Sequence, residues 1–246
     1  YVHPAGQEPA QALVDARDEM NRYVGTVVTY TFGSSREVLD GSTIHTWVSL
    51  NESGQPLLDE TIVSEYVSDL AKKYNTAYTK RKFMTSYGRE VEVSGVYGWR
   101  INQTAETAAL TEIIRSGESQ TREPEYSQKA ASHDGNDYGT TYAEVNLTAQ
   151  HLFFYKDGEK ILESDFVSGN VSRGYTTPPG LFSLTYKQKD AVLRGEGYAS
   201  PVDFWMPFNG GIGFHDASWR NQFGGTIYKT NGSHGCINMP YNAAKT

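Results

Sequence analysis

Residues 149–167 read AQHLFFYKDGEKILESDFV, and this stretch decides the fold class of the second half of the chain. Apolar and polar side chains alternate on both sides of Asp157-Gly158, a dipeptide that favours a two-residue hairpin turn. Short strand-like runs separated by glycine and proline follow at 176–186, 202–208 and 210–216, and only YNAAKT at 241–246 has a helical pattern. Residues 140–246 are therefore predicted to form a mainly β domain.

The first half alternates between helix and strand patterns. Helix formers at 10–23 end before Gly25, a second helical pattern has Asp59 as its N-cap, and a third stops at Gly117. The second and third patterns cover 60–74 and 104–116, and the strand candidates are 26–32, 43–50 and 90–101. These patterns predict an α+β module over residues 1–125.

Residues 118–139 are polar and contain Pro124, Gly135 and Gly139. They have neither periodicity nor enough apolar area to pack. We therefore predict a linker at 126–139 between the α+β module and the β domain.

Charge and composition exclude several classes of protein. The chain has 246 residues, with 22 basic and 29 acidic side chains and a formal charge of -7, which argues against a nucleic-acid partner. No apolar run approaches the roughly 20 residues of a membrane helix, and no leader pattern opens the chain. Because the chain starts at Tyr1, we expect any anchor or signal to lie upstream.

The single cysteine, Cys236, lies in the sequence SHGCIN at 233–238. A cysteine acts as a nucleophile only as its thiolate, so it needs a base or a lowered pKa. Six histidines are candidates for that base: His3, His45, His133, His151, His215 and His234. His215 ends the strand-like run GGIGFHD, and His234 shares the loop of Cys236; for the other four we expect surface or hydrogen-bonded rings.

The order of these residues argues against other uses of a cysteine. Papain-like peptidases place the histidine well downstream of the cysteine, whereas no histidine follows Cys236. Sortases need an arginine shortly after the cysteine, and the tail INMPYNAAKT has none. His215, His234 and Cys236 could supply three zinc ligands, but the usual paired spacing is absent. We predict no metal and no cofactor.

His215, followed after seventeen residues by Ser233-His234-Gly235-Cys236-Ile237-Asn238, resembles the motif of YkuD-type L,D-transpeptidases, which cross-link bacterial cell walls. Residues 151–169 resemble the opening hairpin of that family, and TTPPGLF at 176–182 resembles its Thr-Pro-x-Gly-x-Phe element. The resemblance covers 140–246 and implies a β-sandwich-like catalytic domain. The order of the two parts, a leading module followed by this domain, is similar to the two-domain layout of Gram-positive members such as an enterococcal enzyme. In those members the leading module is peptidoglycan-binding-like.

The resemblance implies that Cys236 is the nucleophile and His215 its general base, paired as thiolate and imidazolium. The group that orients the imidazole is either the carboxylate of Asp216 or, as we favour, a backbone carbonyl near it. Gly235 is expected to let the chain bend so that the amides of Gly235 and Cys236, with Ser233 or His234, face the oxyanion. For His234 a structural role is an equal alternative.

By the same resemblance the donor is a tetrapeptide stem of peptidoglycan that loses its terminal D-alanine, and an amine from a neighbouring stem completes a link between third residues. Carbapenems are expected to acylate the cysteine. Trp205, Met206 and Trp219 lie close to the motif and are candidates for the wall of the stem pocket, although the tryptophans equally suit a core. Asn238 is expected near the substrate as an amide that staples the loop.

An L,D-carboxypeptidase would use the same residues with water as acceptor, and a non-catalytic wall-binding module is the alternative of a different class. We expect a monomer outside the cytoplasm, at the cell wall or cell surface, tethered by an N-terminal segment beyond this chain. Members of the family usually continue past the motif with a helix and a closing strand, whereas this chain stops at Thr246, so we expect either a missing segment or an unusual end of the domain.

Overall fold

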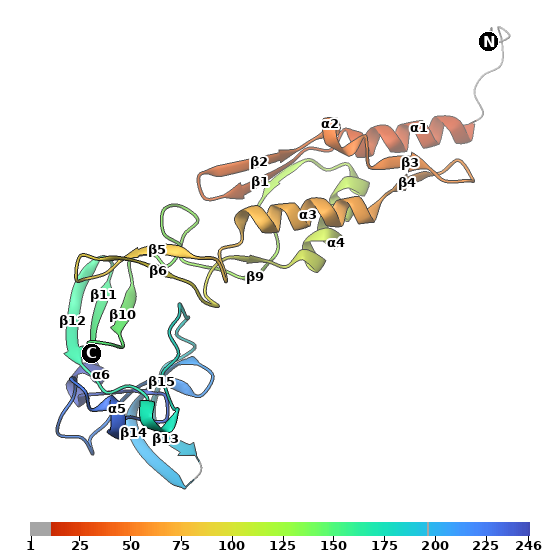
Figure 1. Ribbon diagram of the computed structural model, residues 1–246. Coiled ribbons are helices and arrows are strands. Elements are labelled where there is room, and N and C mark those ends of the chain that lie inside the picture. The colour runs from red at the N-terminus through yellow and green to blue at the C-terminus, as the bar shows by residue number, and fades with distance from the viewer. Residues whose placement is uncertain (1–10, 196) are drawn as a thin grey trace, which may run out of the picture. The chain divides into compact units, whose positions relative to one another are not determined.

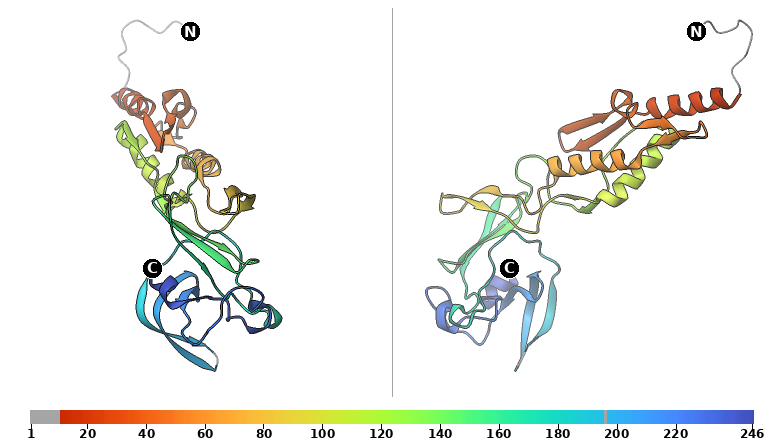
Figure 2. Two further views of the ribbon diagram at one scale, coloured as in Figure 1. Left: turned by 90° about the vertical axis from the view of Figure 1, so that its left-hand side faces the viewer. Right: turned by 45° about the vertical axis from the view of Figure 1, so that its right-hand side comes forward.

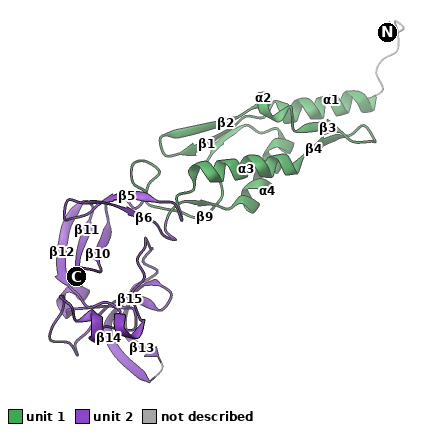
Figure 3. Ribbon diagram, in the orientation of Figure 1, with its two compact units in different colours: residues 1–76, 98–137 green, residues 77–97, 138–246 purple. Residues whose placement is uncertain are grey.

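The computed structural model describes residues 11–195 and 197–246, and its contacts divide the chain into two compact units (Figure 3). Unit 1 comprises residues 1–76 and 98–137, and unit 2 comprises residues 77–97 and 138–246. This division differs from the predicted succession of domains, because residues 77–97 pack in the mainly β unit rather than in the leading module. His3, one of the histidines expected at the surface, lies outside the described residues.

Unit 1 is an α+β unit in which α3 and α4 lie side by side (Figure 1). Its helices are α1 (Gln11–Val24), α2 (Gly41–Ile44), α3 (Glu60–Tyr74) and α4 (Gln103–Ser116). Its strands are β1 (Val28–Phe32), β2 (Ser35–Leu39), β3 (Val48–Leu50), β4 (Pro56–Leu58), β7 (Arg100–Ile101), β8 (Gln120–Arg122) and β9 (Tyr126–Gln128). A sheet in the order β2-β1-β8 is accompanied by the antiparallel pairs β3-β4 and β7-β9.

Local sequence signals account for the long helices of unit 1. Helix α3 begins after Asp59, whose side chain accepts a hydrogen bond from the amide of Thr61 at 2.9 Å. Helix α4 ends at Gly117, which has the left-handed φ of 78° that favours glycine. Both ends agree with the sequence patterns.

Short elements differ from the predictions. Helix α2 occupies the start of the predicted strand at 43–50, because the side chain of Asp40 accepts a hydrogen bond from Ser42 and caps a helical turn. The stretch at 118–139 is not a plain linker. It supplies β8, which pairs in parallel with β1, and β9, which pairs with β7.

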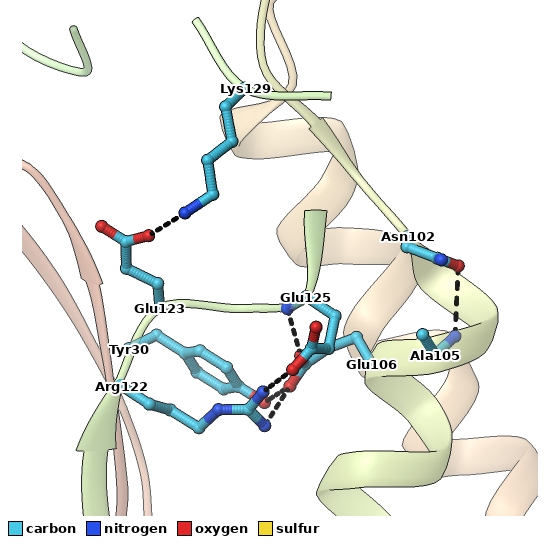
Figure 4. A network of polar contacts seen from close by, with 8 residues as sticks. All are labelled: Tyr30, Asn102, Ala105, Glu106, Arg122, Glu123, Glu125 and Lys129. Carbon is cyan, nitrogen blue, oxygen red and sulfur yellow. Dashed lines mark hydrogen bonds and ion pairs between the residues drawn. The ribbon is translucent and has the colours of Figure 1, made fainter. Parts of the chain in front are cut away.

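A buried carboxylate ties the helical and sheet parts of unit 1 together (Figure 4). Glu106 on α4 is fully buried and accepts hydrogen bonds from the hydroxyl of Tyr30 at 2.5 Å, the guanidinium of Arg122 at 3.0 Å and the amide of Glu125 at 2.6 Å. Burial raises the pKa of Glu106 in spite of these donors. Three donors therefore stabilise an acid that would be costly to bury alone.

Unit 2 contains two larger sheets, in the orders β10-β11-β12 and β13-β14-β15-β16, and the hairpin β5-β6. Its strands are β5 (Arg81–Met84), β6 (Glu90–Val93), β10 (Tyr142–Asn146), β11 (His151–Lys156), β12 (Glu159–Asp165), β13 (Gln188–Gly195), β14 (Tyr198–Asn209), β15 (Ile212–Asp216) and β16 (Ile237–Met239). Its helices are η1 (Val171–Arg173), α5 (Tyr228–Asn231) and α6 (Tyr241–Lys245). The β13–β14 hairpin projects from this unit (Figure 2).

The core of unit 2 lies between its two larger sheets and confirms the sandwich-like prediction. Leu152 of β11 packs in one cluster with Phe214 of β15 and Ile237 of β16, and α6 contributes two alanines. The predicted turn between β11 and β12 is present, with φ of 54° at Asp157 and 85° at Gly158. Over the described ranges of both units, no helix combines the length and the apolar character needed to cross a membrane.

Candidate active site

Two neighbouring strands of the four-stranded sheet, β15 and β16, bring the cysteine and a histidine to one face. Strands β15 and β16 are parallel neighbours with Phe214 opposite Ile237, and both of these side chains enter the core between the sheets. Because side chains alternate along a strand, the flanking residues Cys236 and His215 belong to the other face. Trp205 shows this, since it packs with Cys236 and its ring centroid lies 6.0 Å from that of His215.

The imidazole of His215 is buried and held by the main chain. Its Nδ1 donates a hydrogen bond to the carbonyl oxygen of Asp216 at 2.8 Å, which leaves Nε2 as the proton acceptor of a neutral ring. The Asp216 carboxylate instead accepts hydrogen bonds from the amides of Asp203 and Phe204, each at 2.9 Å. The backbone carbonyl of Asp216 therefore orients the imidazole ring, whereas the side chain of Asp216 binds the main chain of β14.

Burial shifts the pKa of the thiol and that of the imidazole toward the neutral forms. The Sγ of Cys236 donates to the carbonyl of Gly211 at 3.6 Å, and burial raises the pKa of this thiol despite a hydrogen bond from Gly213. Burial likewise lowers the pKa of His215, opposed by its bond to Asp216. Both directions favour thiol and imidazole at rest over the expected thiolate–imidazolium pair.

The loop that carries Cys236 is closed by the side chain of Ser233. The hydroxyl of Ser233 donates to the carbonyl of Cys236 at 2.6 Å and accepts from the amide of Gly235 at 3.0 Å. Gly235 has a φ of 123°, a conformation that side chains disfavour. The loop geometry thus depends on both Ser233 and Gly235.

Two of the four amides considered for an oxyanion site are already engaged. The Gly235 amide donates to Ser233, and the Ser233 amide donates to the carbonyl of Ser168 at 2.9 Å. Within the described ranges, the amides of His234 and Cys236 have no hydrogen-bond partner. The expectation that Gly235 donates to an oxyanion therefore does not fit this loop, whereas His234 and Cys236 remain suitable donors.

A buried threonine, to which the sequence argument gave no role, holds the same loop. The hydroxyl of Thr177 donates to the carbonyl of Gly235 at 2.6 Å and accepts from the amide of Gly169 at 3.0 Å. Thr177 belongs to the element TTPPGLF, so the sequence signal was present although the contact was not predictable. His234, the neighbour of Gly235, is exposed between the rings of Tyr175 and Tyr198.

The residues considered for a substrate pocket divide between the two faces of the sheet. Trp205 is buried on the face of Cys236, and Trp219 is 50% exposed with its ring centroid 5.9 Å from that of His215. The placement of Met206 at the pocket was wrong, because Met206 follows Trp205 on β14 and packs into the core between the sheets.

Two buried polar atoms near the site have no partner among the described residues. Asn238 is opposite His215 on β16, and its Oδ1 is buried without a hydrogen bond, so no stapling bond of that oxygen is present. Arg220 was not predicted from the sequence, and its Nε is likewise buried without a hydrogen-bond partner. After burial itself, the charge of Arg220 also lowers the pKa of His215. Among the described residues no group of three or more metal-ligating side chains occurs.

Comparisons with known proteins agree with this architecture. Residues 140–246 match the family model of the YkuD L,D-transpeptidase catalytic domain, and residues 9–123 match the model described as "Putative peptidoglycan binding domain". The crystal structure of a mutant Enterococcus faecium L,D-transpeptidase is 38% identical, covering 94% of each chain with a TM-score of 0.74. The Ldtfm–avibactam carbamoyl enzyme is also 38% identical, covering 95% of this chain and 92% of that one with a TM-score of 0.75. Nothing among the curated protein sequences matches.

The fold and the two family models define a two-part protein with a leading module and a YkuD catalytic domain. The chain belongs to the L,D-transpeptidase family.

Proposed function

We propose that this protein is a peptidoglycan L,D-transpeptidase that joins the third residues of two stem peptides through a thioester on Cys236. The observation that carries the proposal is the arrangement of Cys236 and His215 on one face of adjacent strands, with Nδ1 of His215 bonded to the main chain. That bond leaves Nε2 to exchange protons with the substrate and the thiol. The membership of the chain in the family supports the same reaction.

In the first half-reaction, the proton of the Cys236 thiol passes to Nε2 of His215 while the sulfur attacks the carbonyl carbon of the third stem residue. The carbonyl oxygen becomes an oxyanion, for which the amides of His234 and Cys236 are the proposed donors. The carbon–nitrogen bond to D-alanine then breaks, and the imidazolium gives its proton to the leaving amine. The stem remains attached to the sulfur as a thioester.

In the second half-reaction, the amine of an acceptor stem gives a proton to His215 and its nitrogen attacks the thioester carbon. The carbon–sulfur bond breaks, the new amide forms, and the sulfur regains its proton from the imidazolium. Burial of both groups suits this cycle because each returns to its neutral form. A lost oxyanion donor is expected to slow the first half-reaction by about 10² to 10³.

Product analysis tests the proposal. The protein is incubated with disaccharide-tetrapeptide, with and without an excess of acceptor stem, and the products are analysed by tandem mass spectrometry. We expect free D-alanine and a dimer linked through third residues, both lost in Cys236→Ala. D-alanine without dimer in excess acceptor would instead identify an L,D-carboxypeptidase. No D-alanine from the wild type would leave only a wall-binding role.

We also propose that carbapenems acylate Cys236, since their strained lactam presents a carbonyl to the same sulfur. The existence of an avibactam carbamoyl enzyme of the related Ldtfm supports attack on such electrophiles. The family model over residues 9–123 supports a role of unit 1 in binding peptidoglycan, and we place the protein at the cell wall.

A further inference from the structure

A segment outside the matched catalytic domain forms part of the unit that carries the site. The match covers residues 140–246, yet residues 77–97 also belong to unit 2. The turn of hairpin β5–β6 is bound to β10, where the amide and hydroxyl of Ser86 donate to the carboxylate of Glu144 at 2.9 and 2.5 Å. Tyr87 meets the ring of Phe153 on β11 edge to face. The hairpin is thus anchored to the three-stranded sheet.

The stretch after the hairpin, residues 94–97, engages the main chain of Leu181. The amide of Leu181 donates to the carbonyl of Ser94 at 3.1 Å, and the amide of Tyr97 donates to the carbonyl of Leu181 at 3.1 Å. Between them, Gly95 lies so close that a Cβ there would be 2.3 Å from both the nitrogen and the oxygen of Leu181. Only glycine permits this approach.

Leu181 lies in the same short loop as Thr177, whose hydroxyl holds the Gly235 carbonyl beside Cys236. Pro178, Pro179 and Gly180 separate the two contacts, and the prolines fix φ at two of these three positions. We therefore expect most of a shift of Leu181 to reach Thr177 through this short segment.

We propose that residues 94–97 are a positioning element of the active site, which holds Leu181 and thereby keeps Thr177 on the loop of Cys236. The importance of this element for catalysis rests on the proposed function. The positioning itself can be measured on the thiol alone, because Cys236 is the single cysteine of the chain.

The main variant is Gly95→Ala, which forces residues 94–97 away from Leu181. Its matched control is Gly88→Asn at the turn of the same hairpin, where φ is 73° and no atom lies within 4 Å of an added Cβ. Asparagine tolerates this left-handed conformation better than other side chains. Pro179→Gly, at an exposed position, loosens the connection between Leu181 and Thr177 without removing either contact.

Two rates are measured on the full chain: acylation by a carbapenem, followed by intact-protein mass, and alkylation of the thiol by iodoacetamide across pH. We expect Gly95→Ala and Pro179→Gly each to slow acylation by about 2- to 30-fold. Both should also move the midpoint of the alkylation profile to lower pH, because a loosened loop exposes a thiol whose pKa is raised by burial. Gly88→Asn should match the wild type in both rates.

A double-mutant cycle shows whether the effect passes through Thr177. Thr177→Val should slow acylation and Thr177→Ser should restore it, because serine keeps the hydroxyl. Adding Gly95→Ala to Thr177→Val should cause no further loss. Wild-type rates in both Gly95→Ala and Pro179→Gly, or fully multiplicative losses in the double variant, would overturn the proposal. If Gly95→Ala does not fold, Pro179→Gly and the Thr177 pair decide it.

The outcome is separable from that of the proposed function. If the wild type forms no acyl adduct, the transpeptidase proposal fails, whereas the alkylation profiles of the same variants still show whether residues 94–97 position Cys236. If acylation proceeds but no variant shifts the alkylation midpoint, the positioning proposal fails alone.

Discussion

Replacing Asp216 by asparagine separates the two roles that this residue offers to the site. Its carbonyl accepts the hydrogen bond from Nδ1 of His215, whereas its carboxylate accepts hydrogen bonds from the amides of Asp203 and Phe204. Asp216→Asn keeps the carbonyl and one side-chain oxygen acceptor. Asp216→Ala keeps the carbonyl alone.

The expected magnitudes differ sharply between the two accounts. A carboxylate that orients a catalytic histidine is worth about 10⁴ in rate in serine proteases. If the main chain orients His215, Asp216→Asn should retain acylation within about threefold of the wild type. The change should appear instead in stability, at about 1 kcal/mol for asparagine and about 2 to 4 kcal/mol for alanine, which leaves two amides without their acceptor.

The assay combines a time course of carbapenem acylation by intact-protein mass with urea unfolding of each variant. Rates are compared under conditions in which both variants are folded. A loss of more than about 100-fold in folded Asp216→Asn would refute the assignment of ring orientation to the main chain, since it approaches the effect of a lost orienting carboxylate.

Three further predictions concern the loop of Cys236, the pH dependence of acylation and the buried Glu106. Ser233→Ala removes both bonds that close the loop and should slow acylation by up to about 10²-fold, while Ser233→Thr, which keeps the hydroxyl, should retain most of the rate. The acylation rate should fall only below pH 6.5, because burial lowers the pKa of His215 from that value. No rise from thiol ionisation should appear below pH 9, because burial raises the pKa of Cys236 from 9.0. A rate–pH profile measured where the protein is stable checks both expectations. Glu106→Ala removes the buried acceptor of Tyr30, of Arg122 and of the Glu125 amide, and leaves Arg122 with only its ion pair to Glu125; it should lower the free energy of unfolding by about 3 to 5 kcal/mol in urea, with acylation of the folded protein unchanged.

The sign of the stability change with pH follows from the same shift of His215. Its folded pKa lies below its unfolded value of 6.5, so the unfolded state binds the proton more tightly. The contribution of His215 is therefore fully present above pH 6.5 and decreases as the pH falls through that value toward the folded pKa. His215→Gln should flatten this part of the stability profile, and an unchanged slope would contradict the lowered pKa.

The elements that were predictable from the sequence carry strong local signals. Helix α3 was predictable from its N-cap Asp59 and fifteen residues of helical periodicity, and the β11–β12 turn was predictable from Asp157-Gly158. Strands β8 and β9 were missed because three residues are too few for a periodic pattern and their partners are distant in sequence. The place of residues 77–97 in unit 2 was equally hidden, since it depends on contacts with β10, β11 and Leu181.

The candidate site was predictable to the extent that it follows a motif. The spacing from His215 to Cys236 predicted both site residues and indicated the family, but it could not predict the burial that shifts their pKa values toward the neutral forms. Met206 was misplaced because the face of a strand residue depends on the register of β14, which the sequence leaves open. Thr177 and Arg220 were missed because their roles depend on neighbours brought close only by folding.

The most direct measurement of the central claim is the intact mass of the protein after carbapenem treatment, compared among wild type, Cys236→Ala and His215→Gln. The account predicts one adduct on the wild type, mapped to Cys236 by peptide analysis, none on Cys236→Ala, and adduct formation slowed by at least about 10²-fold in His215→Gln. An adduct on Cys236→Ala, or equal rates for the wild type and His215→Gln, would contradict it.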